Sequence, residues 1–445
     1  MNIRCITAVR TAKIIAFICR RLGYQGETWA GKAALMICPD VVSRLSGQVR
    51  EKIFVVCGTN GKTTTNNMLC AALEAEGKKV VCNHSGSNME NGVAAAFVLA
   101  AGTDGKLDAD YACIEVDEAC TRLIFPELNP DIMVLTNLFR DQLDRYGEID
   151  HTMEILETMI KANPQMKLVL NGDDPLSVYL AIESGNAYVT YGINDPVPAD
   201  HLSEIREGRF CKRCGERLVY RFYHFSQLGD YRCPSCGFCR PKAGYNAEAP
   251  EVGKEIAFSV EGRRLKAAYK GLYNVYNILA AYSAVREAGL SGEHFQEMLG
   301  AFHPENGRAE EFRICGAHVL LNLAKNPAGF DQNIAAVLQD ERPKDVFIFI
   351  NDNDQDGRDI SWLWDVDFES LKDPSVRSIT VGGIRKQDMR LRLKYADIPC
   401  TLSEDEQADI RKKAKEGSRN ICLLVNYTAL YKTRAFLKKL EAEET

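Results

Sequence analysis

The sequence has no apolar run long enough to cross a bilayer. The longest apolar stretch near its N-terminus, IIAFIC at residues 14–19, is closely followed by Arg20 and Arg21, and a membrane-spanning helix needs about 20 apolar residues. No secretory signal pattern is present either. These absences argue against an integral membrane protein and predict a globular protein of the cytoplasm.

Positive charge is not in excess. Lys and Arg number 55 against 61 Asp and Glu, which gives a net charge of -6 and a pI near 5.8. Tight sequence-independent binding to nucleic acid needs a basic field that this balance does not supply. We therefore expect no nucleic-acid partner.

Histidine is scarce, and cysteine is not arranged for nucleophilic catalysis. There are seven histidines and sixteen cysteines, and no cysteine lies in a recognisable nucleophile turn with a matching histidine. The chain is thus not expected to release ammonia from glutamine by itself. Cysteines scattered through helix-like and strand-like segments fit thiols kept reduced in a cytosol.

The pattern of strands and helices predicts an α/β fold. Residues 1–49 have helical periodicity, and from 50 to 312 strand-like runs alternate with helical ones, as in a parallel sheet covered by helices. Residues 205–245 break this rhythm with cysteines, aromatics and basic side chains, so we interpret them as an insertion. Residues 313–445 alternate again and predict a second, smaller α/β domain.

A phosphate-binding loop is predicted at residues 58–65, GTNGKTTT, between a buried strand and a helix. Glycines let backbone N–H groups turn toward phosphate oxygens at a helix N-terminus, and the lysine and first threonine of such loops reach the phosphates and Mg²⁺. Val56 stands where the general pattern has its first glycine, so this is a shortened variant. The predicted ATP-binding residues are Gly58, Thr59, Asn60, Gly61, Lys62, Thr63 and Thr64.

A carboxylate for the magnesium ion is expected at a neighbouring strand end. The segment YACIEVDEA at 111–119 supplies it, with Glu115 as the first choice and Asp117 and Glu118 as alternatives. Alternation along a strand points Glu115 and Asp117 to the same side. The competing interpretation is that these acids are merely solvated at a strand end.

Two CxxC pairs in the insertion have the spacing of a structural zinc site. Eighteen residues separate the pairs, and a glycine follows each of them, which suits a four-thiolate zinc ribbon. A redox pair is the alternative, but a redox motif needs no second copy. The predicted ligands are Cys211, Cys214, Cys233 and Cys236, with Cys239 as a spare thiol.

Five segments together resemble the Mur ligases, which use ATP to convert a carboxylate to an acyl phosphate that an amine attacks. They are GTNGKTTT at 58–65, TNLFRDQLDRYGE at 136–148, GLYNVYNILAA at 271–281, NGRAEEF at 306–312 and LNLAKNPAG at 321–329. The resemblance covers nearly the whole chain. It implies a central ATPase domain of Mur-ligase type, carrying the zinc ribbon, followed by the smaller C-terminal domain.

The ribbon, the lack of an N-terminal nucleotide-sugar domain and the segment NDNDQDGRDISWLWDVDFE at 351–369 resemble one branch of that family. Its members are synthetase subunits that amidate the α-carboxylate of D-glutamate in lipid II, giving D-isoglutamine with ammonia from a GatD-type glutaminase. The resemblance therefore implies ATP, Mg²⁺ and structural Zn²⁺ as cofactors and a heterodimer with that glutaminase. It also implies a cytoplasmic location at the inner membrane face, where lipid II lies.

The resemblance also implies roles for single residues. Asn274 and Asn277 match asparagines that meet the adenine, although they could instead cap a helix. Arg308 would approach the nucleotide when the domains close, or form an interdomain ion pair. Asn322, Lys325 and Asn326 would approach it in the same way.

Two departures concern the metals. Gln142 stands where Mur ligases have a histidine for a second metal, and Glu157 stands where they have a carbamylated lysine. A glutamate offers a carboxylate directly. The number of magnesium ions therefore stays open.

The C-terminal domain is expected to complete the glutaminase centre of the partner. By resemblance an aspartate from the acidic segment joins the partner's Cys and His, orienting the imidazole as in other triads. Asp359 is selected from Asp352, Asp354, Asp356 and Asp359, with Asp356 as runner-up, and the alternative is that Asp359 only caps the helix after it. Trp362 and Trp364 are an interface anchor or plain core.

Two other functions stay open at this point. One is a Mur-type or folylpolyglutamate-type ligase that acts without a partner. The other is a zinc-ribbon binding module without catalysis, which the basic and aromatic residues of the ribbon permit.

Overall fold

The computed structural model describes residues 3–22, 26–140, 149–197, 207–253, 255–302, 310–353, 355–417 and 419–444. These residues fold into two compact units. Phe302 belongs to the first and Glu310 to the second, so the second unit begins earlier than the expected boundary near 313. No helix among the described residues is long and apolar enough to cross a membrane.

The first unit is built on a nine-stranded sheet of order β11-β10-β9-β6-β5-β4-β1-β3-β2. The strands from β2 to β9 in that order pair in parallel, and β10 and β11 add two antiparallel strands at one edge. The expected alternation of strands and helices is confirmed. The strands are β1 (Lys52–Cys57), β2 (Val80–Cys82), β3 (Tyr111–Glu115), β4 (Ile132–Leu135), β5 (Lys167–Asn171), β6 (Tyr188–Ile193), β9 (Tyr245–Val252), β10 (Ile256–Val260) and β11 (Arg263–Ala267).

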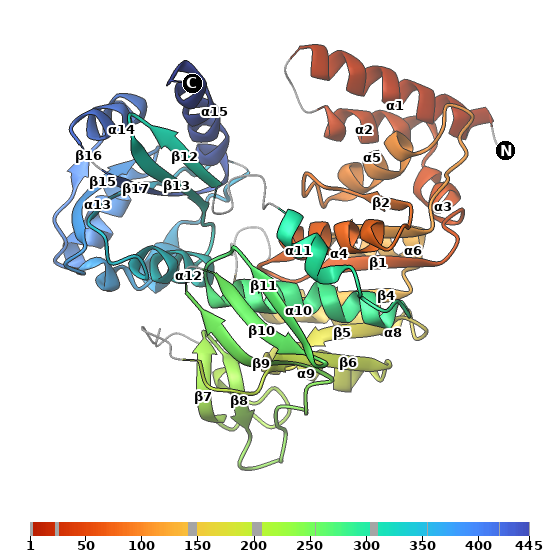
Figure 1. The fold of residues 1–445 in the computed structure, drawn as a ribbon. Coiled ribbons are helices and arrows are strands. Elements are labelled where there is room, and N and C mark those ends of the chain that lie inside the picture. Colours follow the sequence, from red (N-terminus) through yellow and green to blue (C-terminus); the bar gives the residue numbers. More distant parts are fainter. Residues whose placement is uncertain are drawn as a thin grey trace. The chain divides into compact units, whose positions relative to one another are not determined.

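Helices cover both faces of this sheet. α4 (Lys62–Ala75) packs against α10 (Leu272–Glu287), as Figure 1 shows. α6 (Thr121–Leu128) packs against α8 (Ile149–Lys161). The remaining helices of the unit include α5 (Glu90–Ala100), α9 (Pro175–Ser184), α11 (Phe295–Ala301) and the short 3₁₀ turns η1 (Glu118–Cys120) and η2 (Glu207–Arg209).

The N-terminal helices belong to this unit. α1 (Ile3–Arg21), α2 (Glu27–Ile37) and α3 (Val41–Ser46) confirm the helical periodicity of the first 46 residues. α1 and α2 pack on each other and on α5. The buried alanines Ala8, Ala12, Ala30 and Ala34 permit this close approach. Figure 1 shows α1, α2 and α5 stacked at the β2 end of the sheet, with α3 beside them.

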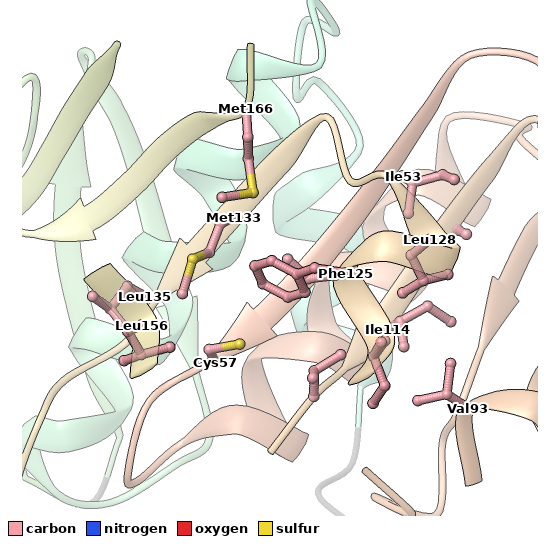
Figure 2. Packing of buried hydrophobic residues seen from close by; sticks show 14 of the residues in the cluster. Ile53, Cys57, Val93, Ile114, Phe125, Leu128, Met133, Leu135, Leu156 and Met166 are labelled. Atoms are coloured by element: carbon pink, nitrogen blue, oxygen red, sulfur yellow. The ribbon is translucent and has the colours of Figure 1, made fainter. Parts of the chain in front are cut away.

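The core of the unit lies between the sheet and its helices. Both faces of β1, β3 and β4 are buried, as expected for central parallel strands. Figure 2 shows side chains of these strands together with Phe125 of α6, among them Ile114 and Met133. Because fully burying one such side chain stabilises the fold by about 1.5–3 kcal/mol, this cluster fixes the strand ends that carry the polar residues below.

The insertion folds as a small hairpin against the same core. β7 (Val219–Phe225) pairs antiparallel with β8 (Leu228–Arg232), and Leu218, Tyr231 and Phe238 join the core cluster of the unit. A buried carboxylate anchors it: Asp173 accepts hydrogen bonds from Arg240 Nε at 2.5 Å and from Tyr276 Oη at 2.7 Å.

That carboxylate stays ionised. Burial acts to raise the pKa of Asp173, but the hydrogen bond from His224 and the charge of Arg240 outweigh it and lower the pKa below its usual value. His224 lies on β7 and Arg240 just beyond β8, while Tyr276 lies on α10. The insertion and α10 are therefore joined through one buried charge.

The second unit contains a six-stranded sheet of order β12-β13-β17-β14-β15-β16, in which only β12 and β13 pair antiparallel. This confirms a second α/β fold. Its elements are β12 (Glu310–Ile314), β13 (Ala317–Leu323), α12 (Pro327–Leu338), β14 (Lys344–Phe349), η3 (Ser361–Asp365), η4 (Phe368–Leu371), β15 (Val376–Gly382), α13 (Lys386–Tyr395), β16 (Thr401–Leu402), α14 (Glu406–Lys415), β17 (Asn420–Val425) and α15 (Tyr427–Glu444).

Candidate phosphate-binding and metal sites

The loop between β1 and α4 has the backbone of a phosphate cradle. Gly58 and Gly61 have positive φ angles of 119° and 85°, which side chains rarely adopt. A Cβ atom on Gly61 would lie 2.2 Å from Asn277 Oδ1, and one on Gly58 would lie 2.2 Å from Thr136 Oγ1. Both glycines are thus required by backbone conformation and by space.

A second loop after β4 holds the cradle in shape. Asn60 donates its N–H to Asn137 Oδ1 at 3.0 Å, and its carbonyl accepts from Thr136 Oγ1 at 2.7 Å. The Thr59 hydroxyl is committed too, since it lies 3.0 Å from the carbonyl oxygen and 2.9 Å from the amide nitrogen of Phe139. The Thr59 hydroxyl therefore positions the loop in this structure, and a contact of Thr59 with phosphate stays a prediction.

Asp174 supports that second loop and was not found from the sequence. Its carboxylate accepts from the Leu138 N–H at 2.9 Å and from Ser177 Oγ at 2.6 Å. Burial raises the pKa of Asp174 to about 6. The GDD motif at the end of β5 was a usable signal, because the ends of parallel strands meet at one edge of a sheet.

Lys62 is buried and paired with Glu118. Its Nζ lies 3.0 Å from Glu118 Oε1 and 2.5 Å from the Gly58 carbonyl oxygen, and Glu118 Oε1 also accepts from the Gly58 N–H at 2.5 Å. Burial raises the pKa of Glu118, and the charge of Lys62 opposes that rise. The Glu118 carboxylate thus occupies the lysine and the backbone N–H that an anionic phosphate would use.

Glu115 is the carboxylate that lies free to bind a cation. Its Oε1 accepts from Asn88 Nδ2 at 2.8 Å, while its buried Oε2 has no hydrogen-bond partner among the described residues. A Cβ atom on Gly86 would lie 2.9 Å from Thr63 Oγ1 and 3.2 Å from Glu115 Oε2. A hydroxyl and an unsatisfied carboxylate oxygen bordering one small space suit Mg²⁺, which prefers hard oxygen ligands.

The three acids after β3 therefore differ in role. Asp117 accepts from the Ala119 N–H at 3.1 Å and caps the turn η1, and Glu118 holds Lys62. Asn83 brackets the Glu115 backbone, accepting from its N–H and donating to its carbonyl, both at 2.8 Å. Asn83 and Asn88, in the loop after β2, were not found from the sequence, although they follow a predicted strand of the same sheet.

Replacing Glu115 with Gln should abolish magnesium binding and leave the fold intact. Gln keeps an oxygen that can accept from Asn88, but it places an NH₂ group where the unpaired Oε2 now lies. Losing one strong electrostatic contact of an active site costs about 10²–10³-fold in turnover, and we expect a loss on that scale in ATP hydrolysis measured against Mg²⁺ concentration. Asp117→Asn is the matched control. If Asp117→Asn lost more ATP hydrolysis than Glu115→Gln, Asp117 would be the metal ligand in place of Glu115.

Asn274 and Asn277 lie in α10, beside the phosphate loop. Asn277 Nδ2 donates to Asn274 Oδ1 at 3.1 Å, and Thr65 Oγ1 donates to Asn277 Oδ1 at 3.4 Å. The alternative that they cap the helix is wrong: α10 begins at Leu272 with Gly271 as its N-cap, so both asparagines lie inside the helix. Their contact with adenine stays a prediction.

The four predicted zinc ligands lie together. Sγ of Cys211 is 3.6 Å from Sγ of Cys236, and Sγ of Cys214 is 3.4 Å from Sγ of Cys233. All four ligand atoms lie within 4.8 Å of one another, and none of the four cysteines forms a disulfide. Zn–S bonds of about 2.3 Å in a tetrahedron require similar separations.

Comparisons with known proteins agree with this geometry. The family model "Mur ligase middle domain" matches residues 56–285, and the model "MurT ligase C-terminal" matches residues 323–430. The chain is 35% identical over 428 residues to "Lipid II isoglutaminyl synthase (glutamine-hydrolyzing) subunit MurT" of Staphylococcus aureus (strain N315), covering 95% of each chain. The chain belongs to the MurT family of Mur ligases. A protein of the same name from Streptococcus pneumoniae is 31% identical, with 98% of each chain covered.

Solved structures share the Mur-ligase fold. A pseudomurein peptide ligase type C from Methanothermus fervidus has a TM-score of 0.69 at 24% identity, with 90% of this chain and 81% of that one covered. MurF ligase from Thermotoga maritima in complex with ADP has a TM-score of 0.62 at 14% identity, with 93% and 85% covered. These likenesses confirm the expected Mur-ligase fold.

In the C-terminal unit of this MurT-family chain, the acidic loop after β14 separates its aspartates. Asp356 is buried and holds the start of α15, accepting from the Thr428 N–H at 2.7 Å and from the Thr428 hydroxyl. Asp352 pairs with Arg385. Asp359 is half-buried, and among the described residues it accepts only local bonds, from Ser361 N at 2.9 Å and Ser361 Oγ at 3.0 Å.

The other predicted residues of this unit have simple structural settings. Asn326 caps α12 by accepting from the Gly329 N–H at 2.8 Å, and Asn322 is buried in β13. Lys325 lies between them. Trp362 is buried in the core and Trp364 is 49% exposed, so only the first is plain core. Arg308, Gln142 and Asp354 lie outside the described residues; Glu157 lies in α8 and pairs with Lys161.

Proposed function

We propose that this chain is the ATP-dependent synthetase subunit of a lipid II isoglutaminyl synthase. The observation that carries the proposal is its similarity, across nearly the whole chain, to subunits of that name. The reaction converts the α-carboxylate of D-glutamate in the stem peptide to an acyl phosphate, and ammonia then displaces phosphate to form D-isoglutamine. An enzyme of this class must place anionic phosphates beside a carboxylate and keep water away.

The first unit supplies the groups for phosphate transfer. Thr63 and Glu115 would hold Mg²⁺, which would neutralise phosphate charge when bound. Lys62 and the Gly58 N–H already bind an anion, because both contact the Glu118 carboxylate. Arriving phosphate oxygens would displace that carboxylate from the same donors, so we infer that Glu118 keeps the cradle open and charged before ATP binds.

The partner is proposed to be a GatD-type glutaminase that supplies ammonia, with Asp359 completing its catalytic centre. Two observations support Asp359 over Asp356. The Asp356 carboxylate is buried and bonded to Thr428, whereas Asp359 is half-buried and, in the part of the chain that the structure describes, bonded only to Ser361 within its own turn. An aspartate with a local cap can also face a partner without loss of fold.

Amidation of lipid II by this chain with ATP should require the glutaminase when glutamine is the nitrogen source. Asp359→Asn should lower glutamine-dependent amidation by about 10²–10⁴-fold, because the imidazole of the partner loses its orienting carboxylate, and should keep amidation with free ammonia. Asn still accepts from Ser361, so the turn should stay folded.

Asp356→Asn serves as the parallel variant. If it abolishes glutamine use and Asp359→Asn does not, the shared acid is Asp356. If lipid II is never amidated while ATP is hydrolysed with a soluble carboxylate and no partner, the chain is a stand-alone ligase of Mur type. Measuring product by mass spectrometry separates these results.

We also propose that Cys211, Cys214, Cys233 and Cys236 bind a structural Zn²⁺. Four thiolates close the tetrahedral coordination shell and leave no position for a substrate. The support is the mutual distance of the four sulfurs and the positive φ angles of Gly215 and Gly237, 78° and 77°, at the two turns. The ribbon then serves folding and does no chemistry of its own.

Contact with the membrane surface is proposed for α1 and α2. Seven large apolar side chains on or just after these helices are about half exposed or more: Ile3, Ile14, Phe17, Ile18, Leu22, Trp29 and Met36. α1 also carries five basic residues and no acidic one. Exposed apolar side chains among Lys and Arg are typical of helices that lie on anionic lipid, and the lipid-linked substrate lies at such a surface.

The full chain should float with vesicles that contain anionic phospholipid. Phe17→Ser combined with Trp29→Ser should reduce the bound fraction several-fold, since both apolar burial and charge contribute to such binding. Tyr395→Ser, which changes a 72% exposed aromatic of the other unit, is the control. Equal flotation of all three proteins would exclude α1 and α2 as the contact.

A further inference from the structure

A second cluster of soft metal ligands lies beside the magnesium site. Sγ of Cys70, Sγ of Cys82 and a ring nitrogen of His84 lie within 4.8 Å of one another. Cys70 lies in α4, Cys82 ends β2, and His84 follows in the turn after it. This cluster is separate from the ribbon cysteines, and the ligase reaction proposed above makes no use of it.

The composition of the cluster is that of a zinc site. Two thiolates and one imidazole recur as a zinc ligand set, with a fourth position left for water, and two thiolates neutralise the charge of a divalent ion. Cys70 is buried, Cys82 is half-buried and His84 is exposed, so an ion can enter from the His84 side. The Cys70 sulfur lies 4.0 Å from His84 Nε2, near the ~3.5 Å between two ligands of one zinc.

A neighbouring amide also lacks a partner. Asn66 is fully buried, and its Nδ2 donates to Cys82 Sγ at 3.2 Å and to Asn83 Oδ1 at 3.3 Å. Its Oδ1 has no hydrogen-bond partner among the described residues. Buried polar atoms are nearly always paired, and a water bound to an ion at Cys82 is a donor of the kind that is missing here.

We propose that Cys70, Cys82 and His84 bind a second zinc ion, which fixes the turn after β2 against α4. That turn carries the groups around Glu115. Asn83, between two of the ligands, holds the Glu115 backbone through two bonds of 2.8 Å, and Asn88 holds its side chain. α4 begins with Lys62 and Thr63. An ion joining α4 to this turn therefore holds the two sides of the magnesium site together.

Zinc content of the purified full-length chain tests the proposal. We expect two zinc ions per chain in the wild type, one in Cys82→Ser and one in His84→Ala, measured by elemental analysis after dialysis against a weak chelator. Cys400→Ser, a half-buried cysteine outside both clusters, is the control and should keep two. A count of one zinc ion in the wild type that His84→Ala leaves unchanged would overturn the proposal.

Cobalt gives a readout that does not depend on activity. Co²⁺ bound to the wild type should give thiolate charge-transfer absorption from both sites. Cys70→Ser should remove the absorption of the Cys70, Cys82 and His84 site and leave the absorption of the four ribbon cysteines unchanged. The Mg²⁺ concentration for half-maximal ATP hydrolysis should rise about tenfold in His84→Ala, the scale on which residues supporting a metal ligand act. A disulfide between Cys70 and Cys82 in the native protein, seen as a loss of two hydrogens by mass, would also overturn the zinc site.

Discussion

Lys62→Met should abolish ATP-dependent amidation and also destabilise the fold. The activity falls because the phosphates lose their cation, a loss of at least about 10²–10³-fold. The stability falls because Glu118, with its side chain only 6% exposed, loses its partner. Breaking a buried ion pair from one side costs about 3–5 kcal/mol. Turnover and thermal unfolding of the pure chain measure the two effects.

The double variant Lys62→Met/Glu118→Gln separates the two effects. Gln removes the unpaired charge and can still accept from the Gly58 N–H, so most of the lost stability should return while amidation stays absent. Glu118→Gln alone removes the carboxylate beside the buried Lys62 and should also lower stability, although Lys62 Nζ can still donate to the Gly58 carbonyl oxygen. If the double variant were as unstable as Lys62→Met, the cost would come from lost packing of the lysine stem and not from a buried charge.

The destabilisation by Lys62→Met should grow with pH. Burial raises the pKa of Glu118 in the folded protein, and Lys62 now opposes this rise; without the lysine the folded pKa moves higher still. Above the unfolded pKa of about 4.3, the folded variant then holds a proton that the unfolded chain has released, so its stability falls as pH rises toward the folded pKa. Unfolding at pH 5 and pH 8 should show the smaller loss at pH 5.

Removing two ribbon cysteines should unfold the insertion. In Cys214→Ser/Cys236→Ser only two thiolates remain, and a site with two sulfurs cannot close the coordination shell. Structural zinc contributes about 10–16 kcal/mol in small zinc domains, and losing even about 3 kcal/mol would raise local opening more than a hundredfold. Hydrogen exchange of β7 and β8 should speed up by at least that factor.

Cys239→Ser is the matched control for the ribbon. Cys239 is exposed and lies three residues after the second CxxC pair, outside the four-sulfur cluster. The Cys239→Ser variant should keep the zinc content of the wild type and its rates of hydrogen exchange in β7 and β8. Protected β7 and β8 amides in the Cys214→Ser/Cys236→Ser protein would mean that packing of Leu218, Tyr231 and Phe238 alone holds the insertion.

Much of the fold was predictable because its signals are local. Apolar strand runs ending in glycine or acidic residues gave β1, β3 and β5, and the CxxC spacing alone predicted the four sulfurs that the structure brings together. These patterns depend on neighbouring residues only. The helices α1–α3 were also predicted from periodicity, but not that they pack on α5 within the first unit.

The sequence could not predict which polar residue makes which contact in the site, because these contacts join segments that are distant along the chain. Glu115 and Glu118 are three positions apart and look alike in sequence, yet one faces Asn88 and Thr63 while the other faces Lys62. Thr59 has the same residue type as Thr63 but is bonded to the loop after β4. These long-range neighbours decide which of the acids has a carboxylate oxygen placed to bind a metal.

The buried charge of Asp173 limits how this architecture can change over evolutionary time. Arg240 and His224 come from the insertion, while Asp173 and Tyr276 come from the surrounding sheet and helix. Deleting the insertion would leave a carboxylate in the core without its cation, at a cost of several kcal/mol. Gain or loss of the insertion should therefore be accompanied by a change at position 173, and chimaeras that exchange it between related proteins should exchange that aspartate as well.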